Sequence, residues 1–315
     1  MDDKNSSNYS IDLSQGGLGL PDRDYYLGSD PELVKARDAY KTYLAAMMTL
    51  AGFDNAPARA QAVFDLETSI AKVQWDRAEN RNATKVYNPM TVTQLQALTP
   101  EFPWSAFFAE CNVPLKAPHG ERSVIVAQKS AFPALAKIFA ATPVPVWRDY
   151  LAVHYLHSFA AELPKRFDDT DFAFYGGVIQ GRKQQLPRAT RAVHLADNLL
   201  GEALGKIYVA RYFPPAAKAK AEQLVANLVK AYEADIKTLD WMSPATRGKA
   251  LEKIRAMAAH IGYPDHWRDY SAYTVTRDDL IGDVQRGAVF EWNRELNRID
   301  GPVDKSEWQM TPPTI

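Results

Sequence analysis

Residues 30–52 read DPELVKARDAYKTYLAAMMTLAG, and this stretch indicates the fold class. Apolar side chains recur along it in steps of three or four residues, at Leu33, Ala36, Tyr40, Leu44, Met47 and Ala51. This spacing places them on one face of an α-helix. Asp30 followed by Pro31 is a typical helix start, and Gly52 is a typical stop. We therefore predict a helix that buries one face.

The same periodicity extends over much of the chain. It predicts further helices at residues 57–74, 143–163, 188–213, 216–239, 243–262 and 276–299. In the last of these, Thr276 and Asp279 resemble a capping box. Strand candidates are short, at residues 9–13 and 123–126. The prediction is a mainly α, multi-helix domain with a few short strands.

Composition excludes several classes of protein. The 315 residues are 46% hydrophobic, which is enough for a large core. Lys and Arg number 37 against 38 Asp and Glu, and no basic run occurs, so no nucleic-acid partner is predicted. Cys111 is the only cysteine, which excludes an internal disulfide framework. No apolar run reaches the roughly 18 residues that span a bilayer, so no membrane segment is predicted.

A metal site is the first chemical hypothesis to consider, because His154 and His157 lie three residues apart in a predicted helix. Zinc needs a third protein ligand that converges on the same point. Glu162 follows His157 by five residues, which turns it away from that face. We interpret His154 as a core or semi-buried histidine with one hydrogen bond. The other histidines, His119, His194, His260 and His266, occur singly, and the chain has no His-Glu-x-x-His motif.

Two glycine-rich stretches suggest phosphate binding at first sight. Residues 176–181 read GGVIQG and residues 16–19 read GGLG, but neither has the Gly-Lys-Ser/Thr ending of a P-loop. We interpret both as turns that use glycine's freedom at positive φ. Cys111 lies beside Asn112 and Pro114 without a basic neighbour, so it is not predicted to be a nucleophile.

Glu67 shares a helical stripe with Val63 and Ile70, so its side chain should point inward. An unpaired buried carboxylate is costly. We predict a buried ion pair with Arg77 or Arg81, with a structural role. The residues therefore predict no catalytic, metal-binding or cofactor-binding side chain in this chain.

Several separated stretches carry a family resemblance. They are GLGLPDRDYYL at 17–27, FDLETSIA at 64–71, NATKVYNPMTVTQL at 82–95, WRDYLAVHYL at 147–156, GEALGKIYVARYF at 201–213, LDWMSPATRGKALEKI at 239–254 and IGYPDHW at 261–267. In this order they resemble the central part of bacterial neprilysin-like zinc metallopeptidases, a family that also contains endothelin-converting enzyme. The resemblance covers nearly the whole chain from about residue 16 onward.

The resemblance implies a helical domain that caps a separate catalytic domain. Residues 1–265 would form the capping domain, and residues 266–315 would form the connection toward the catalytic domain. The ending SEWQMTPPTI at 306–315 resembles the family's EWxMTPxTV segment, after which the substrate-binding strand and the zinc helix follow. None of that machinery has a matching position here, so no catalytic, metal or substrate residue is carried over.

The resemblance implies that this chain functions as one part of a larger enzyme. We expect the non-catalytic helical portion of a zinc metalloendopeptidase, which encloses the active site and restricts substrate size. The parent would hold zinc, cleave peptides, pair this portion with the missing catalytic domain, and work in the periplasm or another extracytoplasmic compartment. The chain alone is expected to be inactive and to hold no cofactor. Two alternatives remain open, a stand-alone helical module that binds peptides or proteins and a degenerate product without function.

Overall fold

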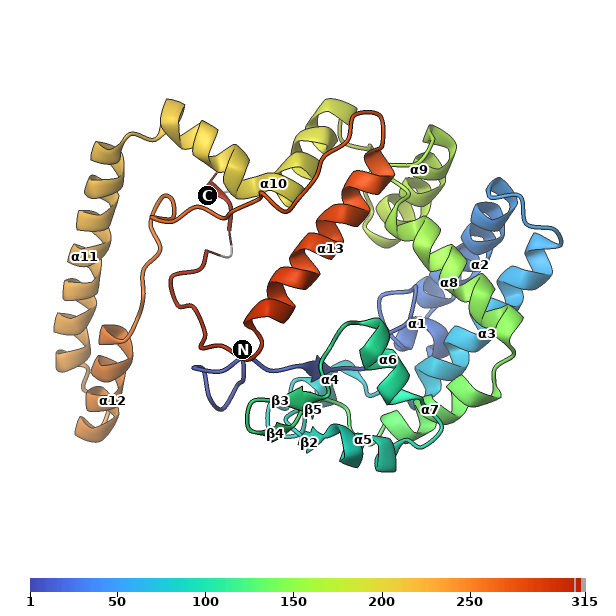
Figure 1. Ribbon diagram of the computed structural model, residues 1–315, viewed down its shortest axis with the longest axis horizontal. Coiled ribbons are helices and arrows are strands. Elements are labelled where there is room, and N and C mark those ends of the chain that lie inside the picture. The colour runs from blue at the N-terminus through green and yellow to red at the C-terminus, as the bar shows by residue number, and fades with distance from the viewer. Residues whose placement is uncertain (309, 313–315) are drawn as a thin grey trace. The chain divides into compact units, whose positions relative to one another are not determined.

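The computed structural model describes residues 1–308 and 310–312, which form two compact units (Figure 1). Unit 1 comprises residues 1–185 and 276–303, and unit 2 comprises residues 186–275 together with the described residues from 304 onward. Within the described residues, no helix is both long and apolar enough to cross a bilayer.

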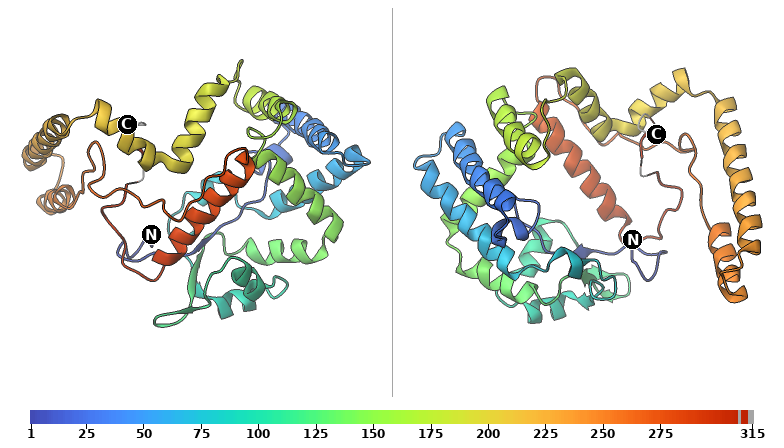
Figure 2. Two further views of the ribbon diagram at one scale, coloured as in Figure 1. Left: turned by 45° about the horizontal axis from the view of Figure 1, so that its top comes forward. Right: turned by 180° about the vertical axis from the view of Figure 1, so that it is seen from behind.

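Unit 1 is mostly helical. Its helices are α1 (Asp24–Leu27), α2 (Pro31–Leu50), α3 (Ala56–Val73), α4 (Arg77–Asn80), α5 (Val92–Leu98), α6 (Trp104–Glu110), α7 (Phe132–Ala141), α8 (Val144–Ser158), α9 (Lys165–Asp171), the π-helix η1 (Phe172–Ile179) and α13 (Leu280–Arg298). Helices α2, α3 and α8 pack against one another, as the opposite views in Figures 1 and 2 show. The main core lies between them and includes the fully buried Met47, Met48 and Val63.

A small sheet supports a second core in unit 1. Its strands β1 (Asp12–Leu13), β5 (Ser123–Val126) and β2 (Pro89–Thr91) lie in the order β1-β5-β2. β1 runs parallel to β5 and β2 runs antiparallel to it, with Met90 opposite Val124. Strands β3 (Lys116–Ala117) and β4 (Gly120–Glu121) form a separate hairpin. Trp104 and Phe108 of α6 pack with these strands to close the second core.

Unit 2 is built on the helices α10 (Arg188–Tyr212), α11 (Pro215–Thr238) and α12 (Pro244–Arg255). Leu200 has φ −133° and ψ 29°, which kinks α10 near its middle. Pro214 separates α10 from α11, because proline cannot continue a helix through its missing N–H. The buried Glu202 of α10 accepts a 2.6 Å hydrogen bond from the Arg268 backbone N–H, which fixes the irregular segment after α12.

The mainly α fold is confirmed, and most predicted helices have the expected positions. At the start of α2, the Asp30 side chain accepts from the Glu32 N–H as a cap. Three boundaries were wrong. α8 ends at Ser158 and α12 ends at Arg255, earlier than predicted. The capping box at Thr276 was also wrong, because Asp279 is itself the N-cap of α13 and accepts from the Gly282 N–H.

The two glycine-rich stretches differ in structure. Gly176 and Gly177 lie inside the π-helix η1, so the prediction of a turn there was wrong, and only Gly181 beyond it has positive φ, at 67°. Gly17 has φ 87°, which confirms the predicted use of glycine in the first stretch. The division into a capping domain at 1–265 and a connection at 266–315 concerns a larger protein and stays a prediction.

Candidate functional site

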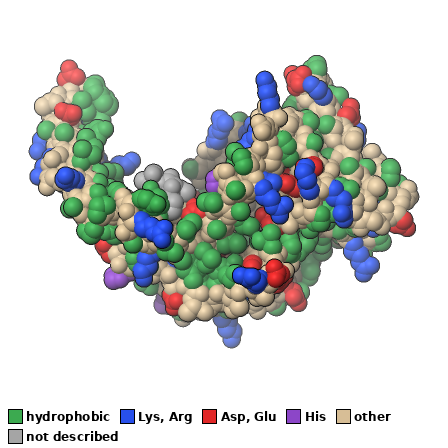
Figure 3. Space-filling view, turned by 90° about the horizontal axis from the view of Figure 1, so that it is seen from above, with side chains coloured by type: hydrophobic (Ala, Val, Ile, Leu, Met, Phe, Trp, Pro, Cys, Tyr) green, Lys and Arg blue, Asp and Glu red, His purple; other side chains and the backbone are tan. Residues whose placement is uncertain are grey.

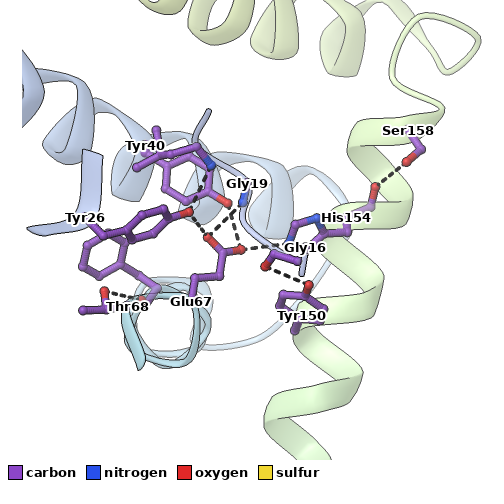
Figure 4. Close-up of polar contacts among 12 residues, drawn as sticks. Gly16, Gly19, Tyr26, Tyr40, Glu67, Thr68, Tyr150, His154 and Ser158 are labelled. Carbon is purple, nitrogen blue, oxygen red and sulfur yellow. Dashed lines mark hydrogen bonds and ion pairs between the residues drawn. The ribbon is translucent and has the colours of Figure 1, made fainter. Parts of the chain in front are cut away.

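Glu67 in α3 is the most unusual buried residue of the chain, since its side chain is fully buried and ionisable. Its helix buries the face that also carries Val63 and Ile70, which confirms that Glu67 points inward. A buried carboxylate requires hydrogen-bond donors around it to offset the loss of water. The arrangement of those donors defines the candidate site (Figure 4).

Four donors from separate segments surround the Glu67 carboxylate. Tyr26 donates its hydroxyl to Oε2 at 2.5 Å, and the Gly19 N–H donates to the same oxygen at 3.4 Å. On the other oxygen, Tyr40 donates at 3.0 Å and His154 Nε2 lies at 2.8 Å (Figure 4). The carboxylate therefore joins α1, α2 and α8 to α3 and to the chain that precedes α1.

The predicted pairing of Glu67 with Arg77 or Arg81 was wrong. Helix α3 ends at Val73, and Arg77 lies beyond the turn, in α4, with 63% of its side chain exposed. There it pairs with Asp22. Two phenols and an imidazole take the place of an arginine because α1, α2 and α8 pack directly across the face of α3 that carries Glu67.

The backbone of the GGLG stretch is held by side chains around the same site. Gln74 donates to the Gly16 carbonyl at 2.7 Å, and Tyr150 donates to the Gly17 carbonyl at 2.9 Å. These bonds use hydroxyl and amide donors from α8 and from the end of α3. They fix a chain segment that has no regular secondary structure of its own.

Position 19 requires glycine because the Tyr40 side chain approaches its backbone closely. A Cβ atom there would lie 2.6 Å from Tyr40 Cζ and even closer to the hydroxyl oxygen. The Gly19 carbonyl also accepts from the Tyr175 hydroxyl at 2.8 Å. The stretch therefore packs against the Glu67 cluster by its backbone, and its carbonyl oxygens accept from phenols.

The tyrosines of the site are held in their protonated form. Burial raises the pKa of Tyr26 and of Tyr40 well above the ordinary value of 10, and the nearby Glu67 charge raises both pKa values further. Burial followed by the Glu67 charge also raises the pKa of Tyr150 and of Tyr175. Protonated phenols donate hydrogen bonds and are poor bases, so this geometry fixes structure.

His157 makes a second, separate pair. Its Nδ1 lies 2.7 Å from Asp171 Oδ1, which also accepts from the Tyr43 hydroxyl at 2.8 Å. The His157 ring stacks on Tyr175 with the ring centres 4.1 Å apart. The two histidines of α8 thus bind different carboxylates, and the interpretation of His154 as semi-buried and hydrogen-bonded is confirmed.

These residues do not fit a zinc site. Glu162 lies in the turn after α8, and neither histidine is free to share a metal with it. Among residues 1–308 and 310–312, no three His, Cys, Asp or Glu side chains come together as metal ligands. His119, His194 and His266 are exposed, and Cys111 is a half-buried free cysteine at the end of α6. That the chain carries no catalytic, metal or cofactor residue stays a prediction.

Tyr26, Tyr40 and His154 are the side-chain partners of Glu67 that sequence reasoning did not connect to it. A signal existed for two of them, Tyr40 and His154. Glu67 and His154 are polar residues on apolar helical stripes, and Tyr40 lies on the stripe of the first predicted helix. Polar groups on such stripes must find each other or other donors in the core.

The sequence that contains this site matches a known protein family. A family model described as Peptidase family M13 matches residues 1–264. The chain belongs to peptidase family M13. The resemblance to neprilysin-like metallopeptidases is thereby confirmed.

Relatives and solved structures support the same assignment. Human endothelin-converting enzyme 1 is 29% identical over 324 aligned positions, which cover all of this chain and 42% of that enzyme. Neprilysin-3 of Drosophila melanogaster is also 29% identical, with the same shares covered. The chain therefore spans less than half the length of these relatives.

Among solved structures, Mycobacterium tuberculosis zinc metalloprotease Zmp1 in complex with an inhibitor is 36% identical, with a TM-score of 0.87. The match covers 98% of this chain and 46% of that one. PepO from Lactobacillus rhamnosis has a TM-score of 0.84 at 21% identity and shows the fold alone. The helical architecture is thus that of the N-terminal region of M13 peptidases.

Proposed function

We propose that this chain is the non-catalytic helical portion of an M13 zinc metalloendopeptidase. The observation that carries the proposal is the family match over residues 1–264 in a chain that spans only 42% to 48% of its relatives. The sequence holds no His-Glu-x-x-His motif. Zinc and the peptide-cleaving groups would then belong to another part of the parent protein.

The role proposed for this portion is to enclose the active site and to limit access to short or flexible peptides. Exposed apolar side chains support the proposal that this portion packs against another protein domain. The hydrophobic side chains that reach the surface are green in Figure 3. Leu224, Leu228 and Tyr232 lie four residues apart on α11 and are at least half exposed. An unpartnered apolar stripe of this kind is typical of a surface that another domain covers.

Peptide substrates and an extracytoplasmic location belong to the proposal for the parent. Membership of the family supports both parts of this proposal. A periplasmic parent would be found in an osmotic-shock fraction, and its recovery with the cytoplasmic proteins would contradict this part of the proposal.

The proposal is tested by metal analysis and a peptidase assay on the 315-residue chain and on the full-length parent. We expect the parent to hold one zinc per chain and to cleave a fluorogenic peptide in a chelator-sensitive way. The 315-residue chain should do neither. Equimolar tight zinc or chelator-sensitive cleavage by the 315-residue chain would overturn the proposal.

A second candidate is a stand-alone peptide-binding module, which one observation favours. A hollow of about 450 Å³ lies between α2 and the α9–η1 segment, with Ala39, Tyr43, Ala173 and Phe174 in its lining. The gene beyond codon 315 separates the two candidates. A reading frame that continues into His-Glu-x-x-His supports the peptidase portion, whereas a stop codon with no catalytic gene nearby supports the module.

A further inference from the structure

Helix α10 contains two buried glycines, Gly201 and Gly205, one helical turn apart. Glycine is a poor residue for a helix interior, because it loses more backbone freedom than other residues and contributes no side chain. Residues four apart share a face of the helix. Two glycines at this spacing therefore leave a notch on one face, into which another segment can approach closely.

The notch is filled by Thr311 and Pro312. A Cβ atom on Gly205 would lie 2.7 Å from Cδ and 2.9 Å from Cγ of Pro312, which is itself buried. A Cβ atom on Gly201 would lie 3.1 Å from Thr311 Cβ and even closer to its Cγ2. A residue larger than glycine at position 201 or 205 would therefore collide with Thr311 or Pro312 at the present backbone distance.

A hydrogen bond sets the register of this segment on the helix. Asp197 precedes the kink at Leu200, but its Oδ1 would lie 3.4 Å from a Cβ atom on Gly201, and its Oδ2 accepts from the Thr311 hydroxyl at 2.8 Å. Asp197, Gly201 and Gly205 follow one another at steps of four residues and meet the two consecutive residues Thr311 and Pro312. We call these three residues of α10 the seat.

The approach to the seat is also held within unit 2. The His260 ring stacks on Trp308 with the ring centres 5.5 Å apart and the planes 13° from parallel. Its Nε2 lies 3.2 Å from the Lys305 carbonyl oxygen. Lys305 and Trp308 therefore contact His260, and Thr311 and Pro312 contact the seat.

We propose that Asp197, Gly201 and Gly205 position the polypeptide that leads from this chain into the catalytic domain. The existence of the seat depends only on contacts within unit 2. Its role in catalysis rests on the proposed function, because it requires a catalytic domain that begins beyond residue 312. The seat residues are positioning residues in this proposal and touch no substrate.

Hydrogen exchange on the 315-residue chain tests the seat. Gly205→Ala is the sharpest variant, because the proline ring is tied to the backbone at both ends and cannot rotate away from the added methyl group. We expect the amides of residues 306–308, 310 and 311 to exchange at least about tenfold faster, since local opening exposes them. Gly248→Ala in α12 is the matched control, because a Cβ atom there meets nothing within 4 Å, and it should leave these rates unchanged.

A second pair of variants keeps the test valid if Gly205→Ala fails to fold by circular dichroism. Thr311→Val removes the hydroxyl at nearly constant shape, and loss of one hydrogen bond of ordinary strength should speed exchange about fivefold. Thr311→Ser keeps the hydroxyl and should restore the original rate. Unchanged exchange of residues 306–308, 310 and 311 in folded Gly205→Ala, or in Thr311→Val, would contradict the role assigned to the seat.

The catalytic role is tested separately on the full-length parent. We expect Gly205→Ala to lower kcat/KM for a fluorogenic peptide at least about tenfold, with zinc content unchanged, because displaced active-site segments lose reactive geometry. Gly248→Ala should retain full activity. Faster exchange with unchanged kcat/KM would overturn the positioning role. An unmodified parent without zinc-dependent activity would contradict the proposed function. The exchange measurements would still show whether the seat holds Thr311 and Pro312.

Discussion

At the scale of single residues, Glu67 shows how a fully buried carboxylate is accommodated. Its oxygens accept from Tyr26 at 2.5 Å and from Tyr40 at 3.0 Å, and His154 Nε2 lies at 2.8 Å. Hydrogen bonds to a charged acceptor are stronger than bonds between neutral groups. The same residue also meets the Gly19 N–H, so a single side chain orders the start of the chain against three helices.

Glu67→Gln should lower the free energy of unfolding by about 2 kcal/mol. The amide nitrogen that replaces one carboxylate oxygen donates hydrogen bonds, so it cannot accept from a phenol, and a buried donor is left facing a donor. Thermal and urea unfolding followed by circular dichroism measure the change. Asp65→Asn, at an exposed position of the same helix, is the control and should stay within about 0.5 kcal/mol of the unmodified chain. An unchanged melting temperature for Glu67→Gln would refute the role assigned to the cluster.

At the scale of elements, the end of α13 is fastened to the second core of unit 1. The Arg122 side chain is 5% exposed and makes two hydrogen bonds of 2.9 Å to the two oxygens of Asp300, just beyond α13. Trp292 donates to the Cys111 carbonyl at 2.8 Å, and Leu296 packs against the core. A helix far along the chain is thus held by residues of the N-terminal half.

The Arg122–Asp300 pair predicts a pH dependence of stability. Hydrogen bonding by the Arg122 guanidinium lowers the pKa of Asp300 below its ordinary value of 3.8. A lowered folded-state pKa gives stability that is present above 3.8 and is lost as the pH falls through the folded value. Asp300→Asn should therefore cost about 1 kcal/mol near neutral pH, a modest value because Asp300 is partly exposed.

Urea unfolding at about pH 7 and at about pH 3 measures this difference. The gap between Asp300→Asn and the unmodified chain should narrow at the lower pH, because below 3.8 the Asp300 carboxylate is protonated in the unfolded chain while Arg122 still favours its ionised form in the folded chain. Asp38→Asn, which removes an exposed partner of Lys41 on α2, is the control. A gap of equal size at both pH values would show that the charge of Asp300 contributes nothing.

At the scale of the whole molecule, apolar surface is left uncovered. No residue of α11 is buried, and Leu224, Leu228 and Tyr232 are 62%, 50% and 58% exposed. Exposed apolar stripes of this length promote association in water. The proposed catalytic partner would cover such a surface in the parent.

The 315-residue chain should therefore self-associate. Light scattering should show an average mass that rises with protein concentration. Leu224→Lys combined with Leu228→Lys should shift the chain toward the monomer, because the change places two charges on the apolar stripe. Gln223→Lys combined with Asn227→Lys adds the same charge at exposed polar positions of α11 and should have a smaller effect. A monomer at all concentrations for the unmodified chain would contradict the prediction.

The sequence by itself determined the helical class, most helix positions and the family. Periodicity reports which face of a helix is apolar, and this depends on neighbours three and four residues away. It predicted the helices now observed as α2, α3, α10 and α11, and it predicted that the Glu67 side chain points into the core. The order of unusual stretches identified the M13 family, because such stretches reflect contacts throughout the fold.

Tertiary structure alone decided the partners. Tyr26, Tyr40 and His154 are 41, 27 and 87 residues from Glu67, so only the packing of α1, α2 and α8 on α3 could select them over the arginines nearby in sequence. The close approach of Gly205 and Pro312 likewise depends on segments that are far apart in the sequence. The local sequence pattern predicts that a side chain is buried. The hydrogen-bond donors that offset the cost of burying a carboxylate come from whichever elements pack against it.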